Sequence, residues 1–279
     1  MSFRYFEVTG HAAVYNKFRH SPPEHLIAKI VNYVKEKVPP PLGTAVDVGC
    51  GGGQSTLVLS PHFQHVVGVD PSAAQIEAAR KRNTAANVSF RVGGAEQTGL
   101  EERSAQLVAA SQACHWFHLP RFYAEAGRVL APSGVLAMYG YTLPLPTHPG
   151  APCLGDVVEK YYKEVLCDYV PPESKNVYLG RYTDEEFYKI PFIEEPLVRD
   201  ESTFVEFPGS VADVVGYVST WSAFQNYRKQ EGDKKSCEIL QSFEKELTDA
   251  LGGQNAPEDV SLKIRYNYFL IMGRKSTKM

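Results

Sequence analysis

The sequence predicts an α/β fold in which a doubly wound, Rossmann-like and mostly parallel sheet of seven strands carries a helical cap. Three observations lead to this prediction. Short apolar runs alternate with helical segments between about residues 40 and 141, a glycine-rich turn follows the first of these runs, and a proline-rich stretch at 143–150 introduces further helices. Strands that alternate with helices in this way pair as a parallel sheet.

The predicted elements of the core follow one another closely. The first helix, at 24–37, has apolar residues at helical spacing and is ended by three consecutive prolines. The strands after it are short and apolar, and turn residues separate them from the helices. In chain order the predicted elements are strand 45–48, helix 54–59, strand 65–70, helix 73–83, strand 88–92, strand 107–111, helix 119–130 and strand 134–141.

After residue 141 the pattern changes. Helical stretches near 156–166, 211–221 and 235–251 are expected to cover the binding site. The segments 197–207 and 262–274 are expected to be the last two strands, and the second of them alternates apolar and polar residues.

These elements predict a single domain over residues 1–279. Its cofactor-binding core is expected at about 40–141, after an N-terminal helical segment at 10–38. The helical cap elements are expected at about 142–190 and 208–252.

Composition places the chain among ordinary globular proteins. With 279 residues, 43% hydrophobic and 22% charged, it can bury a sizeable core. The net charge of −3 gives no general attraction to nucleic acid, and no apolar run is long enough to span a bilayer. Five cysteines without a Cys-x-x-Cys pair argue against a disulfide framework and a zinc site. We expect a soluble, cytoplasmic protein with a small-molecule partner, no nucleic acid, no membrane and no metal, as a monomer or homodimer.

The glycine-rich turn is the most informative feature of the chain. Gly49, Gly51, Gly52 and Gly53 follow a short apolar strand, and Asp70 ends the next apolar run. Glycines let a backbone turn tightly beside a ligand, and a carboxylate about 20 residues on can accept hydrogen bonds from ribose hydroxyls. The turn therefore predicts a nucleoside-binding site at the carboxyl ends of the strands.

Asp47, inside the strand before the turn, distinguishes between two cofactors. A dinucleotide fingerprint has Gly-x-Gly-x-x-Gly and directs a helix N-terminus at a pyrophosphate. An anionic side chain near the turn is a poor neighbour for a pyrophosphate and a good one for an amine-bearing ligand. The pattern favours S-adenosylmethionine over NAD.

At these residues the sequence resembles the class I S-adenosylmethionine-dependent methyltransferases. The matching stretches are 46–53, 69–76 and 111–117. More narrowly, 113–117 and 217–222 look like the eukaryotic branch of trans-aconitate methyltransferase-like proteins. The resemblance covers roughly residues 10 to 141, and it implies that the last two strands close the sheet as an antiparallel edge.

The resemblance also implies which residues contact the cofactor. Gly49 and Gly51 would be approached closely by the methionyl part, Asp70 would bind the ribose, and Asp47 would help to bind the amino group, directly or through water. The remaining contacts lie at the ends of neighbouring strands: Pro71, Ser72, Ala95 and Glu96 around the adenine, and Ser111, Gln112 and Ala113 beneath the sulfonium. A solvated surface carboxylate is the alternative for Glu96.

Two residues of the N-terminal segment belong to the same resemblance. Tyr15 and Arg19 match a Tyr…Tyr-Arg-Pro pattern of the family, although His20 stands where that pattern has proline. Arg19 would bind the methionine carboxylate, because a guanidinium donates two parallel hydrogen bonds to such a group. An ordinary surface arginine is the alternative.

His115 and Trp116 are the candidate catalytic residues. Trp116 would exclude water from the pocket, and His115, expected to titrate near neutrality, would accept a proton from the substrate or orient it. A packing role for His115 is equally open. In the cap, aromatic residues would either line an acceptor site or form a core; they are Tyr161, Tyr162, Tyr217, Trp221 and Phe224.

Together these features predict an enzyme that transfers a methyl group from S-adenosylmethionine to a small molecule and releases S-adenosylhomocysteine. A carboxylate oxygen is one candidate acceptor; it is ionised at neutral pH and needs no base. Two other classes remain open: a catalytically silent S-adenosylmethionine-binding regulatory protein on the same fold, and an NAD-dependent oxidoreductase.

Overall fold

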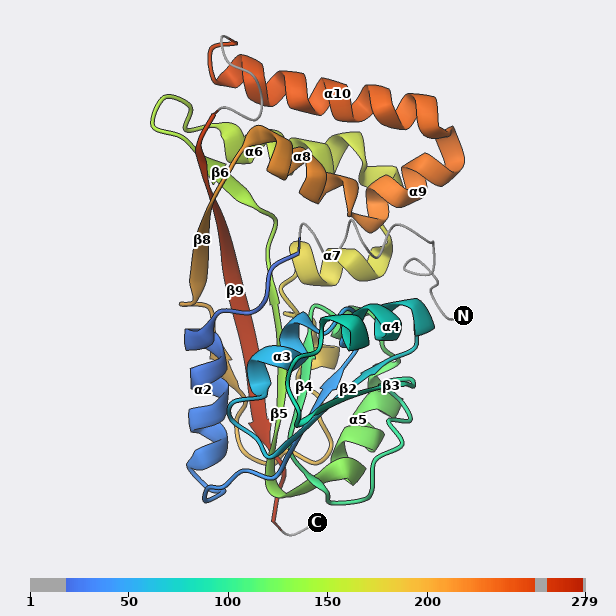
Figure 1. Ribbon diagram of the computed structural model, residues 1–279, viewed down its shortest axis with the longest axis vertical. Helices are drawn as coiled ribbons and strands as arrows, with labels where there is room; N and C mark the ends of the chain where they lie inside the picture. The colour runs from blue at the N-terminus through green and yellow to red at the C-terminus, as the bar shows by residue number, and fades with distance from the viewer. Residues whose placement is uncertain (1–18, 254–259, 278–279) are drawn as a thin grey trace.

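The computed structural model describes residues 19–253 and 260–277 (Figure 1). Five parallel strands form its core in the order β3-β2-β1-β4-β5. This order reverses direction next to β1, which confirms the doubly wound α/β prediction and places a crevice at the carboxyl ends of β1 and β4. The strands are β1 (Thr44–Val48), β2 (His65–Asp70), β3 (Val88–Val92), β4 (Ala105–Ser111) and β5 (Leu130–Tyr141).

In the part of the chain that the structure describes, the sheet has nine strands, so the predicted count of seven is wrong. The long strand β9 (Leu262–Arg274) runs antiparallel to β5, as expected, but it also pairs with three short strands. These are β6 (Leu145–Thr147), β7 (Val198–Asp200) and β8 (Phe204–Gly209).

The pairing register of β9 explains why nine strands are observed where seven were predicted. β5 and β7 both pair with residues 270–272 of β9, so they lie on its two opposite edges. Thr142 continues the β5 edge toward β6, because its N–H donates to the Asn267 carbonyl, and Thr203 continues the β7 edge toward β8 by accepting from the N–H of Tyr268. The nine strands therefore fill seven positions across the sheet, and β9 is an interior strand.

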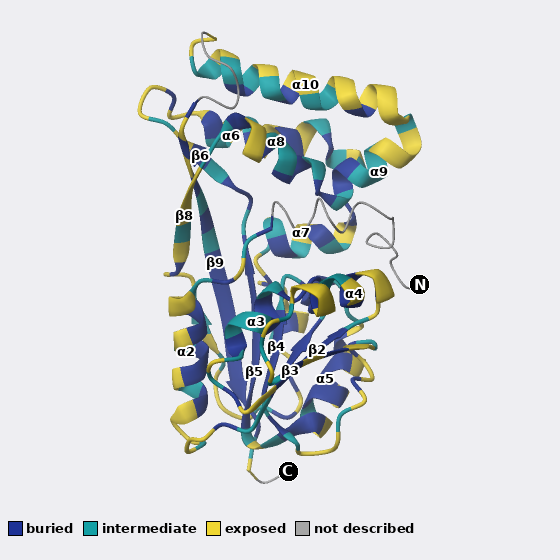
Figure 2. Ribbon diagram, viewed as in Figure 1, coloured by how far each residue is buried: buried dark blue, intermediate teal, exposed yellow. Residues whose placement is uncertain are grey.

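Helices cover both faces of this sheet. The predicted helix 24–37 ends two residues early, and its apolar stripe is buried as expected. One face is covered by α2 (Glu24–Lys35), α3 (Gln54–Leu59) and α4 (Ala73–Arg82); the other is covered by α5 (Leu119–Val129) and the segment 182–193. Figure 2 shows the buried strands between these layers.

The cap lies over the carboxyl ends of the parallel strands (Figure 1). Three features of it differ from the prediction, the first being the helix α9 (Ser222–Glu231), which the sequence pattern did not reveal. Pro171 and Pro172 begin a short helix, α7, that the sequence pattern did not reveal, and the expected helix 211–221 ends at Ser219 because Trp221 adopts an extended conformation. The cap helices are α6 (Leu154–Lys160), α7 (Pro172–Tyr178), α8 (Val211–Ser219), α9 (Ser222–Glu231) and α10 (Asp233–Ala250). Over the ranges that the structure describes, no helix is both long and apolar enough to cross a bilayer.

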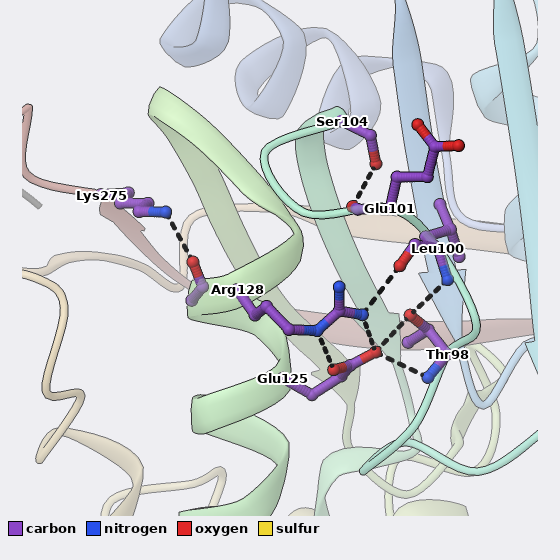
Figure 3. A network of polar contacts seen from close by, with 8 residues as sticks. Thr98, Leu100, Glu101, Ser104, Glu125, Arg128 and Lys275 are labelled. Atoms are coloured by element: carbon purple, nitrogen blue, oxygen red, sulfur yellow. Dashed lines mark hydrogen bonds and ion pairs between the residues drawn. The ribbon is translucent and has the colours of Figure 1, made fainter.

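The loop between β3 and β4 is fixed by a polar network rather than by a crossover helix (Figure 3). One carboxylate oxygen of Glu125, on α5, accepts from the N–H and the hydroxyl of Thr98 at 2.8 and 2.6 Å. Arg128 donates to both oxygens of Glu125 and to the carbonyl of Leu100. Burial raises the pKa of Glu125, but the hydrogen bonds from Arg128 and Thr98 outweigh it, and the net shift is downward.

We predict that Glu125→Ala lowers the free energy of unfolding by about 1–3 kcal/mol, because the buried polar groups of Thr98 lose their acceptor. Urea unfolding measures this change. Glu102→Ala, which removes an exposed carboxylate of the same loop, is the control and should change the stability by about 0.5 kcal/mol or less. Equal effects of the two substitutions would contradict a structural role for the network.

Candidate functional site

The glycine turn is tied to the neighbouring strand. The N–H groups of Gly49 and Cys50 donate to the carbonyl of Val69 at 2.8 and 3.1 Å. Gly49, Gly51 and Gly53 all adopt positive φ, at +70°, +52° and +84°, where other residues are strained.

The two glycines expected to face the methionyl part have different surroundings. A Cβ atom at Gly49 would lie 2.5 Å from the Cβ of Ala113, so packing already requires glycine there. Among residues 19–253 and 260–277, a Cβ atom at Gly51 would meet nothing within 4 Å. Gly51 therefore borders open space, and the contact of Gly49 with a ligand stays a prediction.

Asp70 is held at the end of β2 by backbone hydrogen bonds. Its Oδ2 accepts from the N–H of Gly51 at 2.9 Å, and its Oδ1 accepts from the N–H of Ser72 at 2.8 Å. Burial raises the pKa of Asp70, and these two hydrogen bonds oppose the shift. Each carboxylate oxygen has a second lone pair, so Asp70 can still accept from two hydroxyls next to the open space at Gly51. The turn and Asp70 thus fit the ribose of a nucleoside.

Asp47 lies fully buried behind the turn. Its Oδ2 accepts from the hydroxyls of Ser55 and Thr56, both at 2.6 Å, and so fixes the first turn of α3. Burial raises the pKa of Asp47 to about 6, although the two hydroxyls lower it. Its Oδ1 has no hydrogen-bond partner among the described residues, so this oxygen is the one able to meet a water or an amino group.

The residues expected around the adenine are arranged by local structure. The Ser72 hydroxyl caps α4 by accepting from the N–H of Gln75, while Pro71 is exposed. Ala95 is buried in the core. Glu96 is exposed, and its Oε1 accepts from the N–H of His118 at 3.1 Å. Their contacts with a ligand stay predictions.

Gln112 joins the ends of β4 and β5. It directly follows Ser111 in a left-handed conformation with φ +51°, uncommon outside glycine. Its N–H donates to the Tyr139 carbonyl at 2.9 Å, and its Nε2 donates to the Tyr141 carbonyl at 3.1 Å. Within the described ranges, its Oε1 is buried without a partner.

His115 lies in a 3₁₀ turn (Cys114–Trp116) and is buried. Its Nδ1 is 2.9 Å from the hydroxyl of Tyr182. Burial, helped by the charge of Arg19, lowers the pKa of His115 to about 3. The expectation that His115 titrates near neutrality is therefore wrong, because burial disfavours the imidazolium. The Trp116 ring packs against the imidazole with ring centres 4.9 Å apart.

Arg19 is buried among hydroxyls from three elements. Its Nη1 donates to the hydroxyls of Tyr141, Tyr178 and Tyr217 at 3.1, 3.1 and 2.9 Å. Its Nε donates to the hydroxyl of Thr220 at 3.1 Å. The alternative of an ordinary surface arginine is therefore wrong.

The cap aromatics form a core, which was one of the two expected outcomes. Tyr161, Tyr162, Trp221 and Phe224 are buried within it, and of the set Tyr217 also reaches Arg19 through its hydroxyl. Sequence reasoning missed four residues of the site: Tyr141, Tyr178, Tyr182 and Thr220. Two of them had a usable signal: Tyr141 ends a predicted strand at the sheet edge that carries the site, and Thr220 lies within the matching stretch 217–222. Tyr15 lies outside the described residues.

Comparisons with known proteins agree with this arrangement. The family model of a methyltransferase domain matches residues 46–138, which run from β1 into β5. A candidate methyltransferase of Dictyostelium discoideum is 31% identical over 264 residues, which cover 94% of this chain and 92% of that protein. A trans-aconitate 2-methyltransferase of Methylobacterium radiotolerans is 36% identical over 101 residues, 34% of this chain and 36% of that enzyme.

A solved structure shows the same fold over nearly the whole chain. It is a candidate type II methyltransferase from Anaeromyxobacter dehalogenans, 32% identical in sequence, with a TM-score of 0.67. The similarity covers 92% of this chain and 97% of that chain. The cap is thus included in the likeness.

We predict that Gly51→Ala weakens binding of S-adenosylmethionine by about tenfold, or about 1.4 kcal/mol, because the new methyl group enters the open space beside Asp70. Titration calorimetry measures the affinity. Gly253→Ala is a matched control, since Gly253 also has positive φ and no close neighbour among the described residues, but lies three residues after the end of α10. Equal affinities in the two variants would show that no ligand approaches Gly51.

We predict that His115 stays neutral throughout the physiological range. Its pKa is about 3 in the folded protein, against an ordinary histidine value of 6.5 in the unfolded chain. The unfolded chain therefore gains a proton first, and the free energy of unfolding falls as the pH drops from 6.5 toward 3. His115→Gln should make this fall shallower in urea unfolding. An imidazole NMR signal of His115 that titrates near neutrality would contradict the assignment.

Proposed function

The chain belongs to the class I S-adenosylmethionine-dependent methyltransferases, and from this premise we propose that it methylates a carboxylate oxygen of a small molecule. The observation that carries the cofactor assignment is the pairing of open space at Gly51 with the anchored carboxylate of Asp70, and the buried state of His115 carries the choice of acceptor. When bound, S-adenosylmethionine supplies an electrophilic methyl group, and S-adenosylhomocysteine is the product.

The residues of this chain fit the cofactor in separate ways. Asp70 accepts from the ribose hydroxyls, and Gly51 lets the backbone approach without a side chain. The unpartnered Oδ1 of Asp47 and Oε1 of Gln112, each buried within the described part of the chain, are acceptors for the amino group or for ordered water. Trp116 is half-buried and packs against His115, where it would help to exclude water.

The state of His115 supports a carboxylate acceptor. A hydroxyl or ammonium acceptor has to lose a proton, and an imidazole with a pKa near 3 is a poor base at neutral pH. A carboxylate is already ionised and needs no base. The partial likeness to a trans-aconitate 2-methyltransferase supports the same choice. The net charge of −3 further favours a small molecule over a nucleic acid.

Two measurements test the proposal. Calorimetric titrations with S-adenosylmethionine, S-adenosylhomocysteine and NADH should show binding of the first two alone, and Asp70→Ala should weaken that binding by about 1–3 kcal/mol. Incubation with methyl-labelled S-adenosylmethionine and a set of small carboxylic acids should then give a base-labile methyl ester.

Other outcomes point to the alternatives. Cofactor binding without transfer to any acceptor would indicate a silent binding protein, and NADH binding would indicate an oxidoreductase. A labelled product that resists base would indicate nitrogen or carbon methylation and would overturn the carboxylate assignment.

A further inference from the structure

The chain just after α7 is held in an uncommon backbone conformation. Arg181 and Tyr182 both adopt left-handed φ, at +49° and +54°, where bulky residues are strained. The N–H of Tyr182 donates to the carbonyl of Asn176 at 2.8 Å. Nη2 of Arg199 donates to the carbonyl of Arg181 at 2.9 Å. Strain that such contacts maintain indicates a role for the side chain that it places.

The strained segment places the ring of Tyr182 in the core, where it is fully buried. The ring stacks on Phe187 with ring centres 4.4 Å apart and meets the ring of Phe269 edge-on at 5.0 Å. The Tyr182 hydroxyl lies 2.9 Å from Nδ1 of His115. Packing on the ring therefore fixes the direction of a hydroxyl whose side-chain partner is an imidazole.

The chemistry of the two groups decides which of them donates. A phenol is a stronger acid than a neutral imidazole, and an imidazole nitrogen is a stronger base than a phenol oxygen. Burial raises the pKa of Tyr182 well above its ordinary value, while hydrogen bonds from the backbone N–H groups of His115 and Cys114 lower it. Since these N–H groups donate to the phenol oxygen, the hydroxyl hydrogen is directed at Nδ1. Burial keeps His115 neutral, so its one ring hydrogen is on Nε2.

The donor at Nε2 of His115 lies next to the expected cofactor site. A Cβ atom at Gly49 would lie 2.5 Å from the Cβ of Ala113 and 3.1 Å from the ring of Phe117, so residues on either side of His115 contact the glycine turn. Across residues 19–253 and 260–277, Nε2 has no hydrogen-bond partner, and it is not one of the fully buried atoms that lack one. Nε2 is therefore open to a ligand.

We propose that Tyr182 is a positioning residue: it donates to Nδ1 of His115, fixes the tautomer with hydrogen on Nε2, and so makes His115 a hydrogen-bond donor to the acceptor carboxylate. The inference rests on the proposed function and adds how the acceptor is held and selected. A carboxylate offers lone pairs to the Nε2–H group, whereas an ammonium group offers only hydrogens. Through His115, Tyr182 thus favours carboxylate over ammonium acceptors.

The tautomer of His115 can be measured without turnover. Long-range proton–nitrogen NMR spectra of histidine-labelled protein, saturated with S-adenosylhomocysteine, show which ring nitrogen carries the hydrogen, and His115→Gln assigns the signals. The unmodified protein should show hydrogen on Nε2. In Tyr182→Phe, which keeps the packed ring, the form with hydrogen on Nδ1 should appear beside it. Hydrogen on Nδ1 in the unmodified protein, or identical spectra in the two proteins, would overturn the inference.

Tyr123→Phe is the matched control. Tyr123 is buried in the same part of the core as Tyr182, and its hydroxyl donates to the carbonyl of Glu186 at 3.1 Å. Removing this hydroxyl loosens the segment after Tyr182 without touching the imidazole, so the signals of His115 should stay unchanged. A change as large as that in Tyr182→Phe would assign the effect to loosening of the segment and would contradict the positioning role.

Binding of butyrate tests the donor at Nε2. Titrated into the protein saturated with S-adenosylhomocysteine, butyrate should shift the Nε2–H signal, whereas butylammonium, of the same chain length, should not. Tyr182→Phe should weaken butyrate binding about threefold to tenfold, the loss expected for one hydrogen bond. Tyr123→Phe should bind butyrate as the unmodified protein does. A shift with both ligands or with neither, or equal butyrate affinity in the two variants, would contradict the proposed donor.

The methyl-transfer assay separates this inference from the proposed function. A Tyr182-dependent Nε2–H tautomer that responds to butyrate, in a protein that esterifies no carboxylic acid, would overturn the proposed function and support the positioning role. Ester formation by a protein whose His115 carries hydrogen on Nδ1 would do the reverse. For any acid that is methylated, Tyr182→Phe should raise KM with little change in kcat, because the donor acts on binding of the acceptor; an unchanged KM would count against the inference.

Discussion

The junction between β1 and β2 is the constraint on which the site depends. The carbonyl of Val69 accepts from two successive N–H groups of the glycine turn, and Asp70 accepts from a third, that of Gly51. These bonds close only if the chain after β1 enters the left-handed region, and this is why glycines stand there. Behind the turn, Asp47 fixes the start of α3 from within the core. The same local geometry therefore leaves the backbone at Gly51 accessible and holds the carboxylate of Asp70 in place.

Sequence patterns predicted the parts of the fold that depend on local chemistry. The bounds of β2, β3, α3 and β9 agree with the predicted ranges, because apolar runs and flanking turn residues determine them. The strand count failed because the predicted strand 197–207 is divided into two strands, β7 and β8, and because β6 forms within the proline-rich stretch. All three strands are short and pair with β9. Their stability comes from distant partners, which a local pattern does not reveal.

The residues of the candidate site also fall into two groups, those that a local pattern predicts and those that depend on distant parts of the chain. Gly51 and Asp70 could be found from spacing alone, since turn and acid are fixed to adjacent strands. The partners of Arg19 could not, because they come from the end of β5, from α7 and from α8, up to 201 residues away. The protonation state of His115 also escaped sequence reasoning, since residue type gives the usual pKa while burial beneath the cap decides the actual one.

The length of β9 has a mechanical consequence. Its first half pairs with β6 and β8 next to the cap, and its second half pairs with β5 and β7 in the core of the sheet (Figure 1). The cap and the core of the sheet are thus connected by one continuous, hydrogen-bonded strand. Moving the cap as a whole would bend or twist β9. Such a distortion strains the backbone hydrogen bonds that β9 makes with its four partner strands. The pairing of β9 therefore couples the orientation of the cap to that of the sheet.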